Sequence, residues 1–184
     1  ARGEVGAEEF GFEAGTILEE GVKLPRPYLE VSTKFEAFDR LLTTEEALQI
    51  SNLSLEEFEA IKEIVLKVDE LIEREAGKRG LIHVDGKKEF ALGPNRIPVL
   101  VDSFGTLDED RWWDKEAHNN GEIVQLSKEF VRSHYLGSGH HTQLSKARDE
   151  GGEEPPIPAL PQSMIDRTAD LYASMFERLT GEEF

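Results

Sequence analysis

The chain has 184 residues, 38% of them hydrophobic and 8% aromatic, a composition typical of a globular protein rather than a disordered one. Its formal net charge is −17, which disfavours binding to a nucleic-acid backbone. It contains no cysteine, so disulfides, zinc–thiolate sites and thiol catalysis are excluded. Without cysteine, a cytoplasmic location is the default expectation. No segment approaches the ~20 apolar residues of a membrane helix.

The first half of the chain predicts loops followed by two helices. The first 30 residues are rich in Gly, Glu and Pro and predict loops with one short strand. "TTEEALQI" predicts a short helix with Thr43 or Thr44 as its N-cap. In "SLEEFEAIKEIVLKVDELIEREAGKRG", Ser54 and Glu57 form a capping box. The apolar residues of this segment keep helical spacing for over four turns, which predicts a long helix packed in the core.

The segment "LIHVDGKKEFAL", residues 81–92, has two interpretations. Asp85-Gly86 between apolar neighbours is a hairpin-turn signal. In an unbroken strand, by contrast, Asp85, Lys87 and Glu89 would point from one face. The turn cluster "GPNR" and a second apolar segment, "IPVLVDSFG", come next. We therefore expect two antiparallel strands.

The register of these strands decides whether two carboxylates meet. If Asn95-Arg96 forms the tip of the hairpin, Glu89 faces Asp102. Directly opposed carboxylates repel each other, so a hard cation between them would favour the arrangement. Mg²⁺ prefers one or two carboxylates with water and phosphate oxygens. A solvated face without a ligand is the commoner alternative, and a slip of one residue removes the opposition.

The second half of the chain predicts a charged loop and two helices. "TLDEDRWWDKEAHNNGE" is typical of a charged loop, in which the two Trp residues beside Arg111 indicate an anchored segment. "VQLSKEFVRSHYL" predicts a helix capped by Ser127, and residues 137–161 predict a partly mobile segment. "QSMIDRTADLYASMFERLTG" predicts a closing helix. Its apolar side is expected to carry Ile165, Leu171, Phe176 and Leu179. Two long helices beside a small antiparallel sheet make the expected fold class α+β.

Three histidines cluster in "HYLGSGHH". His134, His140 and His141 are candidate metal ligands, but a closed zinc site needs a fourth ligand that this Gly-rich segment does not offer. The sequence therefore favours solvent-exposed histidines over a metal site.

Several ordered motifs resemble one family. "VDGKKEFAL" followed by "LVDSFGTLDEDRWW" resembles the paired strands of SAICAR synthetase (phosphoribosylaminoimidazole-succinocarboxamide synthase). "LPRPYLEVSTKFEAFDRLLTTEEAL" and "PPIPALPQSMIDRTADLYASMFERLTG" resemble other segments of that family, so the likeness covers most of residues 15–181. It implies an antiparallel sheet packed with long helices, the C-terminal part of an ATP-grasp-related two-domain enzyme. It also implies that residues 85–90 continue as one strand.

The resemblance implies a site for ATP and Mg²⁺. Glu89 and Asp102 match the family's metal-binding carboxylates and are expected to be catalytic. Lys87 matches a catalytic strand lysine near the phosphates, and Asp85 beside it is expected to contribute to cofactor binding. Lys88 departs from the family, which usually has an apolar residue at this position.

The resemblance also implies residues that bind the substrates. Arg111 matches an arginine that holds the ribotide phosphate, and Asp108 matches the acidic start of the same loop. Lys34 matches the lysine of a T-K motif near the substrates. Glu109 and Asp110 depart from the small hydroxyl residues or Gly of the family, and they place negative charge beside the expected anion site.

The implied reaction is an ATP-dependent ligation in de novo purine biosynthesis. L-aspartate joins carboxyaminoimidazole ribotide through an acyl phosphate to give SAICAR, ADP and phosphate. Residues 1–184 are expected to be the C-terminal region, with the family's N-terminal lid domain supplied in cis or by a separate chain. Expected partners are these small molecules and, as is common in the family, a second copy in a homodimer. Two alternatives are a non-catalytic nucleotide- or partner-binding remnant of the ligase, and a ligase for another carboxylate and amine.

Overall fold

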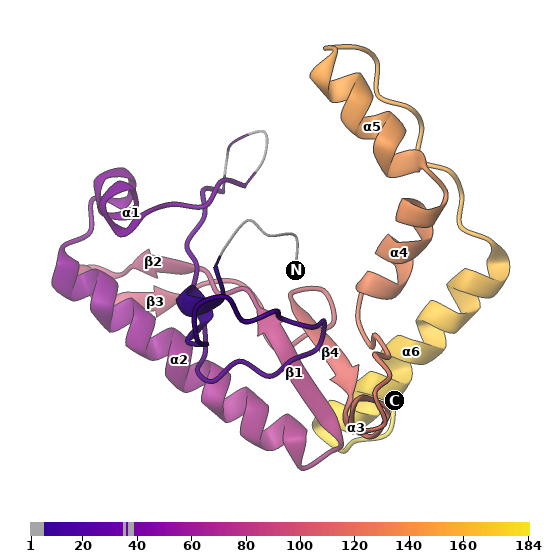
Figure 1. The fold of residues 1–184 in the computed structure, drawn as a ribbon, viewed down its shortest axis with the longest axis horizontal. Helices are drawn as coiled ribbons and strands as arrows, with labels where there is room; N and C mark the ends of the chain where they lie inside the picture. The colour runs from indigo at the N-terminus through magenta and orange to yellow at the C-terminus, as the bar shows by residue number, and fades with distance from the viewer. Residues whose placement is uncertain (1–5, 35, 37–38) are drawn as a thin grey trace. The chain divides into compact units, whose positions relative to one another are not determined.

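A computed structural model describes residues 6–34, 36 and 39–184 (Figure 1). The chain divides into two compact units. The first unit comprises Ala1–Glu70 and Glu89–Val101, and the second unit comprises Leu71–Lys88 and Asp102–Phe184. Helix α2, Leu55–Gly77, begins in the first unit and ends in the second.

The first unit combines long irregular segments with short helices and one small hairpin. Its other regular elements are η1 (Ala7–Phe10), α1 (Thr44–Ser51), β2 (Phe90–Leu92), η2 (Pro94–Arg96) and β3 (Pro98–Leu100). The short strand expected within the first 30 residues is wrong for the described part of that segment. The first strand-like pairing in the described part of the chain follows that segment, as an isolated bridge between Ser32 and Leu41.

Both predicted helix starts are confirmed. Thr43 caps α1, and Glu46 completes the capping box by accepting a hydrogen bond from the Thr43 backbone N–H. At the start of α2, Ser54 and Glu57 make the same two hydrogen bonds, 2.7 and 3.1 Å long. The Arg96 guanidinium also donates to the Glu57 carboxylate. The start of α2 is therefore tied to the loop between β2 and β3.

The second unit holds the larger core. Its elements, after the end of α2, are β1 (Leu81–Gly86), β4 (Asp110–Asp114), α3 (Lys115–Asn119), α4 (Glu129–Gly137), α5 (His140–Asp149) and α6 (Gln162–Thr180). The core consists of Ala76, Leu81, Leu107, Trp112 and Met175. The predicted closing helix is confirmed as α6. Met175 is its fully buried residue, whereas the expected apolar residues Ile165 and Phe176 remain 46% and 38% exposed.

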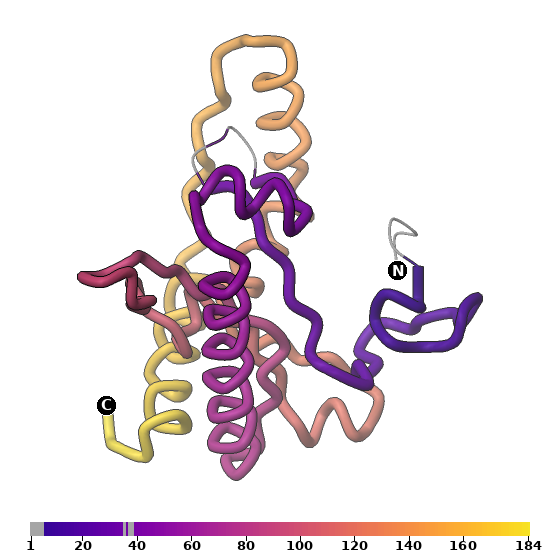
Figure 2. The backbone as a smooth tube through the Cα atoms, turned by 90° about the vertical axis from the view of Figure 1, so that its left-hand side faces the viewer, coloured from indigo at the N-terminus to yellow at the C-terminus, as the bar shows by residue number. Residues whose placement is uncertain are grey.

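The segment predicted to be partly mobile contains a helix, α5. After α5 the chain runs back beside α5 and α4 in both views (Figures 1 and 2). The Tyr135 hydroxyl donates to the Pro158 carbonyl over 2.8 Å, and Arg148 Nε donates to Glu154 over 2.8 Å. These contacts hold the returning segment against the helices. Within the described residues no helix is long and apolar enough to cross a membrane.

Two predictions for the second half of the chain are wrong. The expected charged loop forms β4 and α3, because Trp112 packs into the core and β4 pairs with β1 along its whole length. Ser127 does not cap α4, since Lys128 occupies the N-cap position without a side-chain bond. The Ser127 hydroxyl is instead buried, and no described residue makes a hydrogen bond with it.

Residues 81–92 form neither a hairpin turn at Asp85-Gly86 nor one continuous strand. Strand β1 ends at Gly86 and β2 begins at Phe90, and the two strands belong to different two-stranded sheets. The prediction that Asp85, Lys87 and Glu89 share one strand face is therefore wrong. Each strand follows its own partner, because β1 pairs with β4 while β2 pairs with β3.

The predicted register of the β2–β3 hairpin is wrong by one residue. Leu92 pairs with Pro98, and the Val101 N–H donates to the Glu89 carbonyl over 2.8 Å, so Val101 rather than Asp102 lies opposite Glu89. The loop has three residues, η2, because Asn95 and Arg96 both adopt a φ of 60°. A three-residue loop shifts the register that a two-residue tip would set. The argument for a metal from directly opposed carboxylates is thus lost.

Candidate functional site

The first unit contains two of the predicted site residues, and they form an ion pair. Lys34 Nζ contacts a carboxylate oxygen of Glu89, which lies just before β2. The Glu89 side chain is 16% exposed and that of Lys34 is 49% exposed. The lysine places positive charge against the carboxylate predicted to bind a metal, and both groups remain accessible to solvent.

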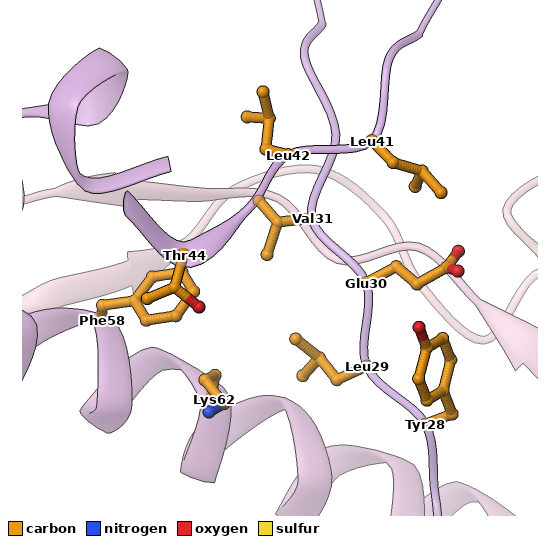
Figure 3. A pocket seen from close by; sticks show the side chains of 9 residues that line it. All are labelled: Tyr28, Leu29, Glu30, Val31, Leu41, Leu42, Thr44, Phe58 and Lys62. Atoms are coloured by element: carbon orange, nitrogen blue, oxygen red, sulfur yellow. The ribbon is translucent and has the colours of Figure 1, made fainter. Parts of the chain in front are cut away.

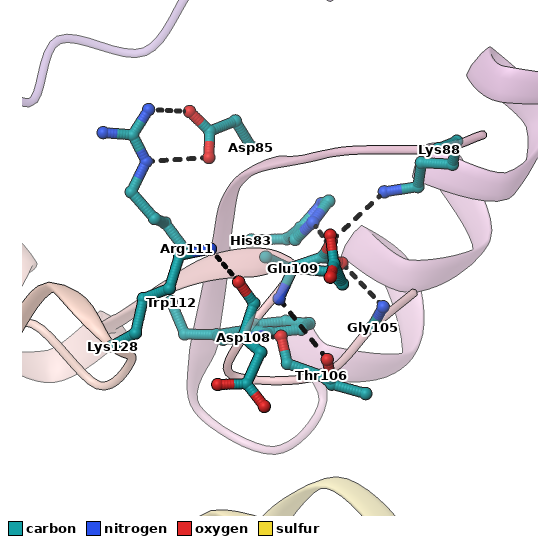
Figure 4. A network of polar contacts seen from close by, with 11 residues as sticks. His83, Asp85, Lys88, Gly105, Thr106, Asp108, Glu109, Arg111, Trp112 and Lys128 are labelled. Atoms are coloured by element: carbon teal, nitrogen blue, oxygen red, sulfur yellow. Dashed lines mark hydrogen bonds and ion pairs between the residues drawn. The ribbon is translucent and has the colours of Figure 1, made fainter. Parts of the chain in front are cut away.

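In the second unit, Arg111 on β4 faces Asp85 on β1 (Figure 4). Arg111 Nε donates to Asp85 Oδ1 over 2.8 Å, and a second guanidinium nitrogen donates to Asp85 Oδ2. The hydrogen bonds that Arg111 donates to Asp85 raise the pKa of Arg111 above its usual value. Arg111 therefore stays cationic at every physiological pH, while its side chain remains 44% exposed.

A β-bulge explains why Asp85 is exposed while His83 is buried. Residues two apart on a regular strand share a face. The pairing with β4 shifts between His83 and Asp85, so that Val84 is an extra residue. The His83 side chain is 1% exposed and that of Asp85 is 49% exposed. The bulge thus turns Asp85 outward to meet Arg111.

Asp108 is anchored to neighbouring elements. Its Oδ1 accepts a hydrogen bond of 2.8 Å from the Tyr172 hydroxyl on α6, and its carbonyl accepts one from Lys128 Nζ. Burial, followed by the contact with Asp108, raises the pKa of Tyr172 to about 12. The phenol therefore remains a donor at neutral pH, and the loop before β4 is held by this bond.

Lys87 and Asp102 lie outside regular strands, and both are exposed. Asp102 has a φ of 91° and Oδ1 accepts from the Ser103 N–H over 2.8 Å. A residue other than Gly in this conformation is uncommon, and such residues concentrate at functional sites. The backbone at Asp102 is therefore an independent reason to keep it as a candidate.

The described residues contain no group of three or more His, Asp or Glu side chains placed to hold a metal ion. His140 is buried against the Tyr135 ring, with the ring centroids 5.9 Å apart, so the expectation of exposure is wrong for this histidine. Mg²⁺ requires only one or two protein carboxylates. Glu89 belongs to the first unit and Asp102 to the second, and their joint role as metal ligands stays a prediction.

Sequence reasoning missed a buried charged cluster formed by His83, Lys88 and Asp110. Asp110 is 0% exposed, and the side chains of His83 and Lys88 are 1% and 2% exposed. His83 Nε2 lies 3.0 Å from Asp110 Oδ2, and Lys88 Nζ lies 3.5 Å from Oδ1. Lys88 and Asp110 each stood out in the sequence as unusual residues, but nothing in the sequence placed them together.

Sequence reasoning also missed a small hollow in the first unit (Figure 3). It has a volume of about 170 Å³ and is lined by Tyr28, Leu29, Glu30, Val31, Leu41, Leu42, Thr44, Phe58 and Lys62. Burial raises the pKa of Tyr28, with a further contribution from Glu30. The hollow is smaller than the roughly 300–1,000 Å³ of typical ligand pockets.

Comparison with known proteins identifies relatives of the chain. Residues 3–148 match the sequence profile of the SAICAR synthetase family. A phosphoribosylaminoimidazole-succinocarboxamide synthase of Thermoplasma acidophilum is 54% identical over 164 residues, which cover 89% of this chain and 56% of that protein. The enzyme of the same name from Thermoplasma volcanium is 51% identical, with 91% of this chain and 57% of that protein covered.

Solved structures show the same fold. A SAICAR synthetase in complex with ADP is 27% identical with a TM-score of 0.64, over 91% of this chain and 56% of that one. SAICAR synthase from Saccharomyces cerevisiae has a TM-score of 0.68 at 24% identity, over 95% of this chain and 53% of that one. The chain thus spans about half the length of the proteins it matches. Because the family profile and these relatives cover most of its residues, the chain belongs to the SAICAR synthetase family.

Proposed function

We propose that this chain is the nucleotide- and substrate-binding part of a SAICAR synthetase. The complete protein then joins L-aspartate to carboxyaminoimidazole ribotide at the expense of ATP. The observation that carries the proposal is the 54% identity to the Thermoplasma acidophilum synthase over 89% of this chain. The ADP bound to a relative of similar fold supports nucleotide binding here.

The proposed chemistry has two steps. An oxygen of the ribotide carboxylate attacks the γ-phosphorus of ATP, and ADP leaves. The amine of L-aspartate then attacks the acyl carbon, inorganic phosphate leaves, and the amine loses a proton. Both steps gather anions, so the protein contributes mainly by positioning the reactants and neutralising their charge. A bound Mg²⁺ would screen phosphate oxygens, with Glu89 and Asp102 as its proposed ligands.

Arg111 is the proposed contact for the ribotide phosphate. Its planar guanidinium makes two bonds to the Asp85 carboxylate, and the same geometry suits a phosphate. Because both partners of this pair are more than 40% exposed, a phosphate can reach the guanidinium and take the place of Asp85. Asp85 would then be released for the cofactor contact predicted from the sequence.

The other proposed contacts are cationic or lie close to a cation. Lys87 is exposed between β1 and β2, where its ammonium group would add positive charge at the transferring phosphoryl. Lys34, which pairs with Glu89, would contribute to substrate binding. Asp108 would contribute to substrate binding through the loop that precedes Arg111. A cytoplasmic location and a homodimer stay predictions.

The test uses the longest natural form of the protein. ATP- and Mg²⁺-dependent formation of SAICAR is measured for Glu89→Ala, Asp102→Ala and the control Glu63→Ala. Glu63 is an exposed glutamate on α2. We expect both site variants to lose turnover while they keep the thermal unfolding profile of the parent, and we expect the control to remain active.

Three other results would redirect the proposal. Near-normal activity of both site variants would remove the carboxylates from the site. Turnover with another carboxylate and amine only would make the protein a related ligase. Nucleotide binding by the complete protein without any turnover would favour the non-catalytic remnant.

A further inference from the structure

The Asp110 carboxylate occupies a space that exists because residue 86 has no side chain. A Cβ added at Gly86 would lie 2.1 Å from Asp110 Oδ1 and 2.5 Å from Lys88 Nζ. A side chain at position 86 would therefore force the Asp110 carboxylate or the Lys88 ammonium group to move. Gly86 of β1 pairs with Asp110 of β4, and its missing side chain leaves the space that the Asp110 carboxylate fills.

The charge of this carboxylate is compensated within the second unit. A buried carboxylate without partners is strongly unfavourable. Lys88 Nζ lies 3.5 Å from Oδ1, which accepts no hydrogen bond from the residues that the structure describes. His83 Nε2 lies 3.0 Å from Oδ2. Together the three side chains make a buried ion cluster rather than a solvated one.

The same carboxylate holds the turn that leads into β4. Asp110 Oδ2 accepts a hydrogen bond of 2.9 Å from the Gly105 N–H, and the Asp110 N–H donates to the Thr106 carbonyl over 3.0 Å. The Trp112 indole N–H also points to the Thr106 carbonyl, at 3.4 Å. The side chain and the backbone of Asp110 therefore both hold the turn by hydrogen bonds.

The alternation of side chains along β4 determines the direction in which Arg111 points. Asp110 and Trp112 are 0% and 1% exposed, and side chains of successive strand residues point to opposite faces. Arg111, between these two buried residues, must therefore point outward, where it meets Asp85 (Figure 4). The charge of Asp110 lies on the inner face, next to Lys88, and not beside the anion expected at Arg111.

We infer that Asp110, held by Lys88 and His83, is a positioning residue that presents Arg111 to an anionic substrate. The inference rests on the proposed function only for the identity of that anion, the ribotide phosphate. Asp110 touches no substrate, so its effect is transmitted through the 105–110 turn and the direction of the Arg111 side chain.

The first part of the test measures the stability of the 105–110 turn, as the amide hydrogen-exchange rate of Gly105 in the complete protein. Asp110→Ala removes the acceptor for Gly105. The pair Asp110→Asn and Lys88→Met keeps an acceptor and removes both charges together. We expect Gly105 to exchange about tenfold faster in Asp110→Ala, with the Met175 amide unchanged as an internal reference. We expect parental exchange in the neutral double variant and in the control Lys78→Met, which alters an exposed lysine.

The second part measures binding in the same variants. If Asp110 positions Arg111, Asp110→Ala raises the KM for the ribotide about tenfold, with kcat and the KM for ATP little changed. The neutral double variant should recover the parental KM. A merely structural role would lower the unfolding temperature and leave this KM unchanged.

Arg111→Ala separates failure of this inference from failure of the proposed function. If Arg111→Ala leaves the ribotide KM unchanged, the proposed phosphate contact is wrong, whatever Gly105 exchange shows. If Arg111→Ala raises the KM but Asp110→Ala does not, the positioning role is overturned. An unchanged Gly105 exchange rate in Asp110→Ala also overturns it. If Asp110→Ala does not fold, the double variant decides, because a tenfold higher ribotide KM with intact Gly105 exchange contradicts the inference.

Discussion

Two ion pairs connect β4 with β1 or with the segment just after it, and they differ in their surroundings. Arg111 and Asp85 meet on the exposed side, with side chains 44% and 49% exposed. Lys88 and Asp110 meet in the interior, with side chains 2% and 0% exposed. An exposed pair contributes little to stability and exchanges its partner readily, whereas a buried pair is rigid and its loss is costly. The Arg111 guanidinium is therefore available to ligands, whereas the buried Asp110 carboxylate holds the strand that carries it.

The largest effect is expected from breaking the buried pair. Lys88→Met leaves the Asp110 carboxylate buried beside His83 without its lysine and should lower the free energy of unfolding by about 3–5 kcal/mol. Adding Asp110→Asn should recover more than half of that loss, because no buried charge then remains. Urea unfolding of the parent, both single variants and the double variant measures this coupling. A loss in the double variant equal to the sum of the two single losses would show that the charges are independent.

The next effect concerns the space at Gly86. Gly86→Ala places a methyl group 2.1 Å from Asp110 Oδ1 and should lower the free energy of unfolding by about 1–3 kcal/mol. Gly77→Ala is the matched control, because a Cβ at Gly77 would meet no described atom within 4 Å beyond its own helix and chain neighbours. Thermal unfolding of the two variants checks the prediction. Equal unfolding temperatures would mean that the Asp110 carboxylate moves away without cost.

A smaller effect is expected on the exposed side. Asp85→Asn removes the charge that faces Arg111 and should change the free energy of unfolding by less than about 1 kcal/mol. Urea unfolding at low and at high salt provides the measurement, because an exposed pair is also screened. A loss as large as that of Lys88→Met would remove the distinction between the two pairs.

The smallest effect is expected from a third ion pair, between Arg96 and Glu57, and it is measured by lowering the pH. The hydrogen bonds from Arg96, followed by that from the Ser54 backbone, lower the pKa of Glu57 to about 2. A carboxyl whose pKa is lowered by folding stabilises the folded state above its unfolded pKa, near 4.5. This contribution is lost as the pH falls from about 4.5 to 2. Unfolding temperatures between pH 6 and 2 should therefore fall more steeply for the parent than for Glu57→Gln.

The local features of the chain were predictable from the sequence. The capping boxes at Thr43 and Ser54 use residues three positions apart, so their signal is contained in one helical turn. The amphipathic helix α6 is likewise a local pattern. The resemblance carried by ordered motifs, including "VDGKKEFAL", led to the family that the comparisons establish.

The register and the strand breaks were not predictable in the same way. Asn95 and Arg96 adopt left-handed conformations, and this choice of loop moved Asp102 out of register with Glu89. The break after Gly86 arises because β1 and β2 pair with different strands. The register and the break cannot be predicted from the short segments alone, because each depends on the strand with which the segment pairs.

By itself, the sequence determined the helix caps, the amphipathic helices and the family. Only the tertiary structure decided that two unusual residues, Lys88 and Asp110, neutralise each other in the space left by Gly86. It also decided, through the bulge between His83 and Asp85, which charges face solvent. The physical reason is range: caps and amphipathic faces form between neighbours along the chain, whereas buried charges and register form between strands that folding brings together.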